Sequence, residues 1–208
     1  MTEEQAKIWL RKHLDVSRET EEKLETFVGF LKREAQSQNL ISASTIESIW
    51  VRHILDSAQL LRFLPVGQQS WIDLGSGAGF PGIVIALLNQ CPVTLVESRA
   101  RRIDYLQRAI ALLDIEGRVT VKGQPLEHVE TAPYSVISAR AFAPLPRLLE
   151  LAERFSTDKT LWLLPKGRNA AMEWEEVQPN WTGDFRIEPS VTDAEAGILV
   201  GHLFAKRQ

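Results

Sequence analysis

The chain has 208 residues, a length that fits one domain of good size with a possible appendage. With 44% hydrophobic and 25% charged residues it is typical of soluble globular proteins, and no apolar run approaches the roughly 18 residues of a membrane-spanning helix. The net charge of −3 argues against a broadly basic nucleic-acid-binding module, and the polar N-terminus argues against a secretory signal. The single cysteine, Cys91, excludes an intrachain disulfide, and the four histidines lack metal-ligand spacing. A cytoplasmic protein without metal is therefore expected.

The first 65 residues carry apolar positions at helical spacing. Helices are expected over 3–35, interrupted at 15–17 where Ser17 is a candidate N-cap, and over 44–63, ended by residues 64–67. We therefore predict an N-terminal helical extension, residues 1–66, that packs on a second, larger unit, residues 67–208.

A glycine-rich turn opens the larger unit. The apolar strand 71–74 contains Asp73, and Gly75, Gly77 and Gly79 follow before the helix predicted over 81–90. Glycines allow positive φ and close approach of a ligand to the backbone, and the following helix start offers free N–H groups, so this is the build of a nucleotide-binding turn. A dinucleotide fingerprint needs a third glycine where Phe80 stands.

The charge of Asp73, before the turn, indicates which kind of nucleotide ligand the turn would bind. Asp73 would repel a pyrophosphate but suits a ligand that carries an ammonium and a sulfonium, and the spacing resembles motif I of Rossmann-like S-adenosylmethionine (SAM) methyltransferases. Glu97 ends the next strand, 22 residues after Gly75, where an acid accepts hydrogen bonds from both ribose hydroxyls of an adenosine. The alternative is that Asp73 and Glu97 are two ordinary strand-end carboxylates.

The rest of the chain alternates strands and helices, which predicts a parallel sheet covered on both faces. Only 190–196 separate the last two strands, enough for a hairpin but too short for a helical crossover. We expect an α/β, Rossmann-like SAM-dependent methyltransferase fold: a seven-stranded, mostly parallel sheet with an antiparallel last strand. The predicted strands are 71–74, 93–97, 118–122, 134–139, 160–165, 184–189 and 197–205, and the predicted helices after the first are 99–113, 124–129, 145–155 and 169–178.

Ligands of such sheets bind at the carboxyl ends of the strands. Arg140 follows the fourth strand, where it either binds the SAM carboxylate or a substrate phosphate or forms a structural salt bridge. Lys166 and Arg168 follow the fifth strand as exposed cations or phosphate contacts. Leu126 and Glu127 stand where many such enzymes contact adenine, although Glu127 equally suits the first turn of a helix. The arginines of the helix 99–113 are expected mostly on a solvated face; they are Arg99, Arg101, Arg102 and Arg108.

The sequence lacks the motifs of several classes of methyl transfer, which reduces the number of reactions to consider. The residues after the fourth strand lack the Asn/Asp-Pro-Pro-aromatic turn that exocyclic amine methylation commonly uses. Cys91, the only thiol, precedes the second strand at the end of the sheet opposite the site, so it is not placed for C5 methylation. No ligand cluster exists for metal-dependent O-methylation. A ring nitrogen such as guanine N7 fits what remains, because it has no proton to lose.

Five segments together resemble the bacterial small-subunit rRNA methyltransferase G family (RsmG, also called GidB) over about residues 25–205. They are Asn39-Leu40-Ile41-Ser42, Arg52-His53-Ile54-Leu55-Asp56-Ser57, Asp73 to Gly82, Ser138-Ala139-Arg140-Ala141-Phe142 and Pro165-Lys166-Gly167. The resemblance implies SAM-dependent methylation of a guanine N7 in 16S rRNA. We expect the rRNA to be bound in the small ribosomal subunit or its precursor and the enzyme to be a monomer. The resemblance also implies cofactor contacts, which fall on Gly75, Phe80, Leu126, Glu127 and Arg140.

The candidate sites follow. Catalytic residues are Arg140, Lys166 and His53; cofactor-binding residues are Asp73, Gly75, Gly77, Gly79, Phe80, Glu97, Leu126, Glu127 and Arg140. Arg52, His53 and Asp56 share a helix face, which forms either an internal Arg52–Asp56 ion pair beside a partly buried histidine or a surface over the cofactor mouth. Two other functions stay open: a small-molecule methyltransferase with the helices as a lid, and a nucleotide-binding protein without catalysis.

Overall fold

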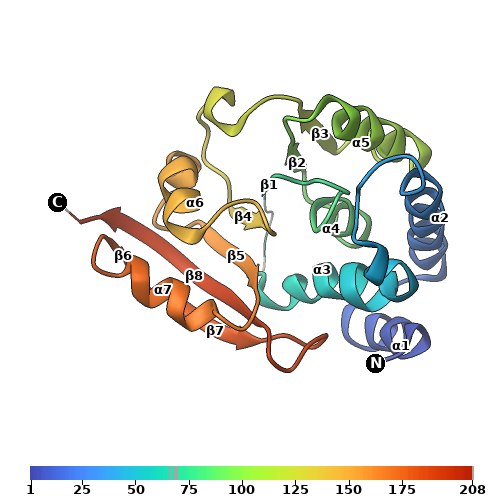
Figure 1. Cartoon of the computed structure of the whole chain (residues 1–208), viewed down its shortest axis with the longest axis horizontal. Coiled ribbons are helices and arrows are strands. Elements are labelled where there is room, and N and C mark those ends of the chain that lie inside the picture. Colours follow the sequence, from blue (N-terminus) through green and yellow to red (C-terminus); the bar gives the residue numbers. More distant parts are fainter. Residues whose placement is uncertain (66, 68–69, 208) are drawn as a thin grey trace.

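The computed structural model describes residues 1–65, 67 and 70–207 (Figure 1). The helices are α1 (Glu3–Leu14), α2 (Arg18–Glu34), α3 (Asp56–Ala58), α4 (Gly82–Leu88), α5 (Ala100–Leu112), α6 (Leu145–Ala152) and α7 (Ala170–Val177). The strands are β1 (Trp71–Leu74), β2 (Val93–Val96), β3 (Val119–Lys122), β4 (Val136–Ala139), β5 (Leu161–Lys166), β6 (Trp181–Gly183), β7 (Arg186–Pro189) and β8 (Gly197–Lys206).

The N-terminal helices begin at capping residues. Thr2 forms a capping box with Gln5 at the start of α1, and the Ser17 side chain accepts a hydrogen bond from the Thr20 amide at 3.1 Å, so the predicted N-cap of α2 is confirmed. The predicted helix 44–63 is not one regular α-helix. It consists of a 3₁₀ segment, a π-helix (Trp50–Leu55), the short α3 and a second 3₁₀ turn. Apolar spacing fixes the buried side of such a segment but does not distinguish these hydrogen-bond registers.

The sheet has the strand order β3-β2-β1-β4-β5-β8-β6, with β7 also paired to β8. Strands β1 to β5 are parallel, and β8 runs antiparallel to β5, as predicted. The predicted count of seven strands is wrong for the described residues, which form eight. Both β6 and β7 pair with β8, and the pairing is interrupted at Asp184, whose side chain accepts a hydrogen bond from the His202 amide. The register against β8 shifts between Thr182 and Gly183, an irregularity of the β-bulge kind that accompanies the division into two short strands.

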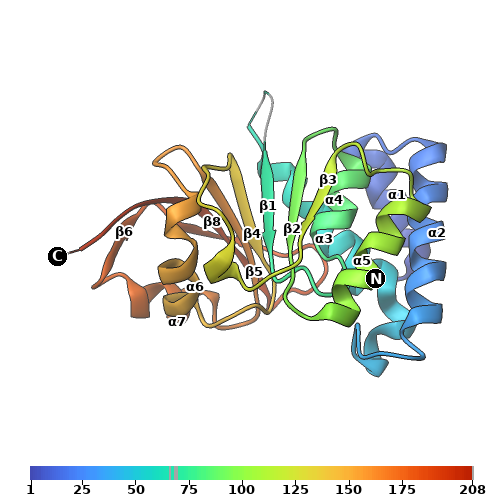
Figure 2. The same cartoon turned by 90° about the horizontal axis from the view of Figure 1, so that it is seen from above.

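Side chains of alternate residues bury on opposite faces of the sheet. Trp71 packs with α1, α2, α4 and α5 in one core, and its neighbour Ile72 packs with α6 and α7 in the other. Figure 2 shows the sheet edge-on between these two groups, with α2 outermost beyond α4 and α5. The predicted helix 124–129 is a single 3₁₀ turn, Leu126–His128, because the backbone is extended at Pro125 before it and at Val129 after it.

The predicted boundary between the two units falls at Val66, which lies outside the described residues, so the division at 66/67 stays a prediction. Over the described chain, no helix combines the length and apolar character needed to cross a bilayer. Strand β1 lies between β2 and β4, so the direction in which strands are added reverses beside it. A crevice is expected at the carboxyl ends of these strands.

Candidate functional site

The glycine turn joins β1 to α4 at the reversal of strand order. Gly75 has a φ of +70°, and a Cβ added there would collide with the ring of Phe142, so glycine is required at this position. Asp73 is fully buried: its carboxylate accepts hydrogen bonds from the Ser138 hydroxyl at 2.8 Å and the Gly82 amide at 3.2 Å. The expectation that Asp73 faces a cationic ligand is therefore not supported by the geometry. Asp73 instead fastens the turn to β4 and to the start of α4.

Glu97 ties the end of β2 to the same turn. Its Oε2 accepts from the Gly77 amide at 3.1 Å, and its Oε1 accepts from the amides of Ser98 and Arg99 at 2.8 and 2.9 Å. Each carboxylate oxygen has two acceptor positions. Both positions of Oε1 are used, whereas Oε2 accepts one hydrogen bond from the described residues and has the Arg102 guanidinium 3.7 Å away. Glu97 thus retains acceptor capacity toward a ligand with hydroxyl groups.

A cavity of about 240 Å³ lies over the turn and this carboxylate. It is lined by Gly75, Val96, Glu97, Ser98, Arg99, Arg102, Gln124, Leu126, Ala141 and Phe142. Three predicted cofactor residues line it: Gly75, Glu97 and the buried, apolar Leu126. Glu127 does not, because its carboxylate is exposed and pairs with Arg147 at 3.1 Å. Phe142 was not among the predicted site residues; an aromatic residue two positions after a strand-end arginine was the available signal.

The rest of the glycine turn contains three further predicted cofactor residues, Gly77, Gly79 and Phe80. Gly77 and Gly79 take φ values of +55° and +89°, which continue the tight path of the backbone. Phe80 is buried, stacks on the His53 ring with centroids 4.9 Å apart, and lies 5.3 Å from the Arg140 guanidinium carbon. None of these three predicted cofactor residues lines the cavity, and their contact with a cofactor stays a prediction.

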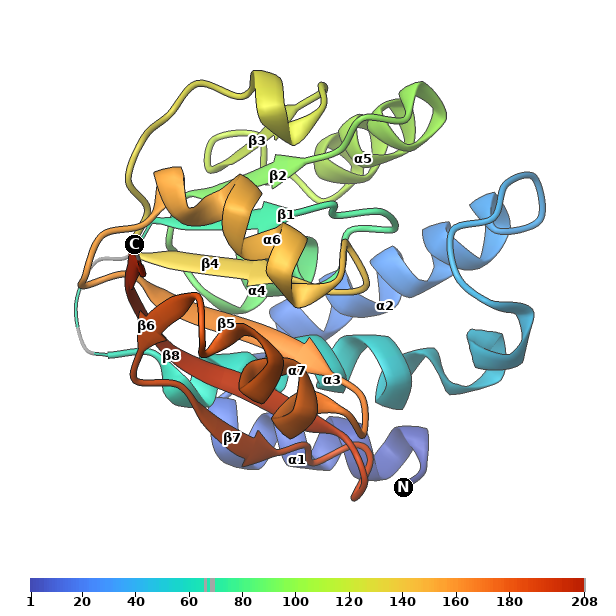
Figure 3. The same cartoon turned by 60° about the vertical axis from the view of Figure 1, so that its left-hand side comes forward.

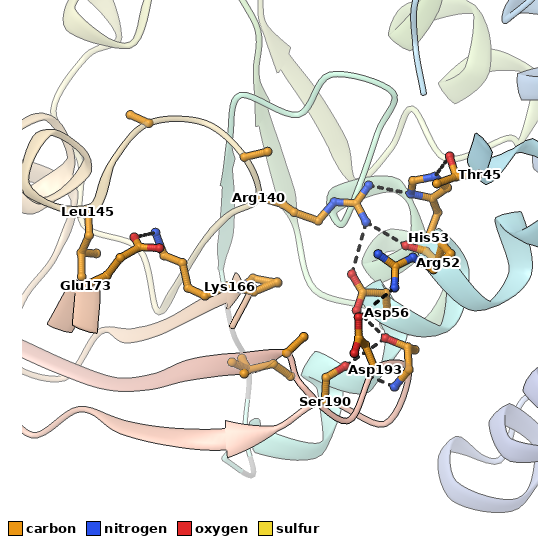
Figure 4. A pocket seen from close by; sticks show the side chains of 18 of the residues that line it. Thr45, Arg52, His53, Asp56, Arg140, Leu145, Lys166, Glu173, Ser190 and Asp193 are labelled. Atoms are coloured by element: carbon orange, nitrogen blue, oxygen red, sulfur yellow. Dashed lines mark hydrogen bonds and ion pairs between the residues drawn. The ribbon is translucent and has the colours of Figure 1, made fainter. Parts of the chain in front are cut away.

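Arg140 is the centre of a hydrogen-bond network in a second, larger cavity of about 830 Å³ (Figure 4). Its Nη1 donates to the Arg52 carbonyl at 3.1 Å and to Asp56 Oδ2 at 3.3 Å, and its Nη2 lies 2.8 Å from His53 Nδ1. The structural salt bridge, one of the two alternatives for Arg140, is present. Arg140 also lines the larger cavity, and binding of a SAM carboxylate or a phosphate stays a prediction. The predicted Arg52–Asp56 pair is wrong, because Arg52 pairs with Asp193 at 3.2 Å.

His53 is held as a neutral imidazole. A guanidinium has no acceptor, so Nδ1 must accept from Arg140, and Nε2 carries the proton and donates to the Thr45 hydroxyl at 2.9 Å. Burial lowers the pKa of His53 to about 3, with the charges of Arg140 and Arg52 acting in the same direction. Both ring nitrogens are engaged within the protein, which makes His53 a positioning residue for Arg140 in this geometry.

The other cations of the large cavity are neutralised by carboxylates. Lys166 Nζ lies 2.8 Å from Glu173, and Arg168 lies 2.7 Å from Glu195 just outside the lining. Ala141 is shared: it lines both cavities, so the loop after β4 separates them and touches each. Within the described part of the chain, no group of three or more His, Cys, Asp or Glu side chains could hold a metal ion.

The stability of the fold should depend on pH through His53 and Asp73 with opposite signs. His53 titrates at about 3 when folded and at 6.5 ordinarily, so its contribution is fully present above pH 6.5 and is lost as the pH falls toward 3. Burial raises the pKa of Asp73 from 3.8 to about 6, so its contribution is fully present below pH 3.8 and is lost as the pH rises through 6. Between pH 6 and 3.8 the two effects offset each other.

Single variants should separate the contributions of His53 and Asp73 to the pH dependence of stability. In urea unfolding between pH 7 and 4, His53→Gln should lose stability less steeply on acidification than the wild type, and Asp73→Asn should lose it more steeply. Unchanged slopes in both folded variants would contradict these titrations.

Comparison with known proteins identifies the family of this chain. A family model described as "rRNA small subunit methyltransferase G" matches residues 20–198. The chain is 57% identical to the ribosomal RNA small subunit methyltransferase G of Rhizorhabdus wittichii, over 96% of this chain and 92% of that protein. It is 49% identical to the protein of the same name from Zymomonas mobilis, over 100% of this chain and 97% of that one.

Solved structures share the fold at low sequence identity. A putative O-methyltransferase from Klebsiella pneumoniae superposes with a TM-score of 0.63 at 16% identity, covering 96% of each chain. A mutant of MtNAS in complex with S-adenosylmethionine superposes with a TM-score of 0.59 at 16% identity, covering 97% of this chain and 84% of the other.

Proposed function

This chain belongs to the rRNA small subunit methyltransferase G family, and we propose on that premise that it transfers a methyl group from SAM to N7 of a guanine in 16S rRNA. The family match carries the rRNA substrate and the methyl transfer. The two adjoining cavities at the carboxyl ends of the strands support the division of the site into a cofactor part and a base part.

The smaller cavity suits the adenosine part of SAM. The free acceptor position of Glu97 fits a ribose hydroxyl, the Leu126 side chain offers an apolar surface to adenine, and Gly75 leaves the backbone open to close approach. When bound, SAM supplies an electrophilic methyl group on its sulfonium.

The larger cavity suits a nucleobase. Its cations are each paired with a carboxylate: Arg140 with Asp56, Lys166 with Glu173 and Arg52 with Asp193. A base gains positive charge when its ring nitrogen is methylated, and here that charge would meet no uncompensated cation. We assign Arg140 and Lys166 to orient the base and His53 to hold Arg140 in place. Guanine N7 has no proton to lose, so the neutral, fully bonded His53 need not act as a base.

The observation that carries this division is the position of Ala141, which lines both cavities. A group held in one cavity and a base held in the other would meet at the loop after β4. Alignment of the two reactants at that loop is the main catalytic contribution that the site can make.

Transfer of tritiated methyl from SAM tests the proposal. The substrates are 16S rRNA from cells that lack the gene, supplied as naked RNA and as assembled small subunits, and the product nucleoside is identified by mass spectrometry. We expect label in 7-methylguanosine. Label on another atom would overturn the N7 assignment, and label in neither RNA form but in a small molecule would favour the small-molecule alternative.

The reaction should need neither a thiol nor a metal. Cys91 is buried between α4 and β2, at the amino end of β2, and burial raises the pKa of its thiol. Cys91→Ser and Cys91→Ala should keep near-normal turnover, and EDTA should not inhibit. Loss of activity with the chelator, or in both variants when their unfolding midpoints match the wild type, would contradict this mechanism.

A further inference from the structure

The phosphates of the RNA need a cationic surface that the large cavity does not offer. The cations at the ends of β4 and β5, and Arg52 opposite them, are each bonded to a carboxylate at 3.3 Å or less. A phosphate could bind there only by competing with those carboxylates. The sequence-based expectation that Lys166 and Arg168 are phosphate contacts therefore faces a cost that the sequence did not reveal.

A third hollow, separate from the large cavity, is a cleft of about 520 Å³ between the segment after α2 and the start of α5. Figure 3 shows the segment after α2 on the same side of the molecule as α5, and in Figures 1 and 2 the two helices lie side by side. The residues that line it include Arg99, Arg101 and Arg102 and no carboxylate; the others are small or uncharged.

The positive charge in this cleft is only partly compensated. Arg101 and Arg102 donate to the carbonyls of Ser37 and Asn39 at 3.0 and 3.2 Å, which fixes the side chains but leaves their charge in place. The nearest carboxylate is Glu97, 3.7 Å from Arg102, and it already accepts three amide hydrogen bonds. The Arg99 side chain has no hydrogen bond or ion pair with any described residue and is exposed.

The cleft also continues into the cofactor cavity, because Arg99 and Arg102 line both. We propose that the α2–α5 cleft binds the phosphate backbone of the rRNA, through Arg99, Arg101 and Arg102, while the target base enters the charge-balanced cavity beyond Ala141. This assignment rests on the proposed function and names the RNA surface of that same site. The expectation of a mostly solvated face is confirmed for Arg99, Arg101 and Arg108, which are exposed, and the proposal gives part of that face a ligand.

Arg108, on the same helix, shows the contrast. It forms two hydrogen bonds of 2.7 Å with Glu34 and one of 2.9 Å with Asp104, so its charge is compensated and it fastens α5 to α2. Position on α5 alone therefore does not create the cationic surface. The cleft is cationic because Arg101 and Arg102 donate hydrogen bonds only to carbonyl oxygens, Glu97 comes no closer than 3.7 Å to Arg102, and the Arg99 side chain bonds to no described residue.

The test measures binding of small-subunit rRNA as a function of KCl concentration for the wild type, Arg99→Gln, Arg101→Gln and the double variant. Each lost phosphate contact should reduce the slope of log K against log salt by about 0.7 to 0.9. We expect the double variant to lose roughly twice that slope and to show a raised KM for rRNA. Arg101 lines the cleft but not the cofactor cavity, so Arg101→Gln alone should leave kcat and the calorimetric affinity for SAM unchanged.

Two controls make the result specific. Arg147→Gln, which removes an exposed, carboxylate-paired arginine from α6, should leave the slope unchanged, and Arg101→Lys should retain it because the charge stays. A double variant that matches the wild type, while Lys166→Ala and Arg168→Ala lower the slope, would overturn the assignment and place the phosphates at the large cavity. If the wild type itself neither binds nor methylates rRNA, the proposed function fails and the assignment fails with it.

Discussion

Replacing Gly75 by alanine should lower the affinity for SAM at least about tenfold, or roughly 1.4 kcal/mol, with the fold retained. The residue has a φ of +70°, which a side chain disfavours, and an added Cβ would push against the Phe142 ring over the cofactor cavity. Relief of that contact would displace either the turn or the loop after β4, and both line the cavity.

Gly117→Ala is the matched control. A Cβ on Gly117 meets no atom within 4 Å, and no strained φ applies there, so this variant should bind SAM like the wild type. Titration calorimetry of both variants, with circular dichroism to confirm folding, decides the matter. Normal SAM affinity in a folded Gly75→Ala protein would remove the glycine turn from the cofactor site.

Replacing Arg140 by alanine should reduce methyl transfer to rRNA by about two orders of magnitude. The guanidinium joins Asp56, the Arg52 carbonyl and His53 in one network, so its loss frees the loop after β4 from the π-helix. Misplacement of the reactants by even about 1 Å can cost on the order of a hundredfold in rate. Single-turnover rates and SAM affinity should be measured separately, since Arg140 lines the larger cavity and precedes Ala141, which lines both cavities.

Arg140→Lys sharpens the test. A lysine keeps the charge but cannot present the planar fork that reaches three acceptors, so it should recover little of the lost rate. Thr45→Val is the milder comparison, because it removes only the hydroxyl that accepts from His53 and should lower the rate less. Nearly full activity in Arg140→Lys would reduce the role of Arg140 to its charge, and full activity in Arg140→Ala would end its role in catalysis.

Local patterns were sufficient for the elements that place the site. The acid-x-Gly-x-Gly-x-Gly spacing predicted the turn after β1, the short link 190–196 predicted the antiparallel β8, and Ser17 predicted the start of α2. These features depend on residues close in sequence, on φ preferences, capping and crossover length. For the same reason the periodicity of 44–63 located a buried helical face but did not reveal the π-helix within it.

Only the tertiary structure decided how the charges pair. Nothing local indicates that Arg140 bonds to His53 and Asp56, that Arg52 turns to Asp193, or that Glu97 spends three of its acceptor positions on backbone amides. These partners lie between 20 and 141 residues apart, apart from the two amides that follow Glu97 directly. The charge of a side chain can therefore be predicted from the sequence. Whether an opposite charge neutralises it depends on which distant segment the fold brings within about 3 Å. That compensation separates the balanced cavity from the cationic cleft.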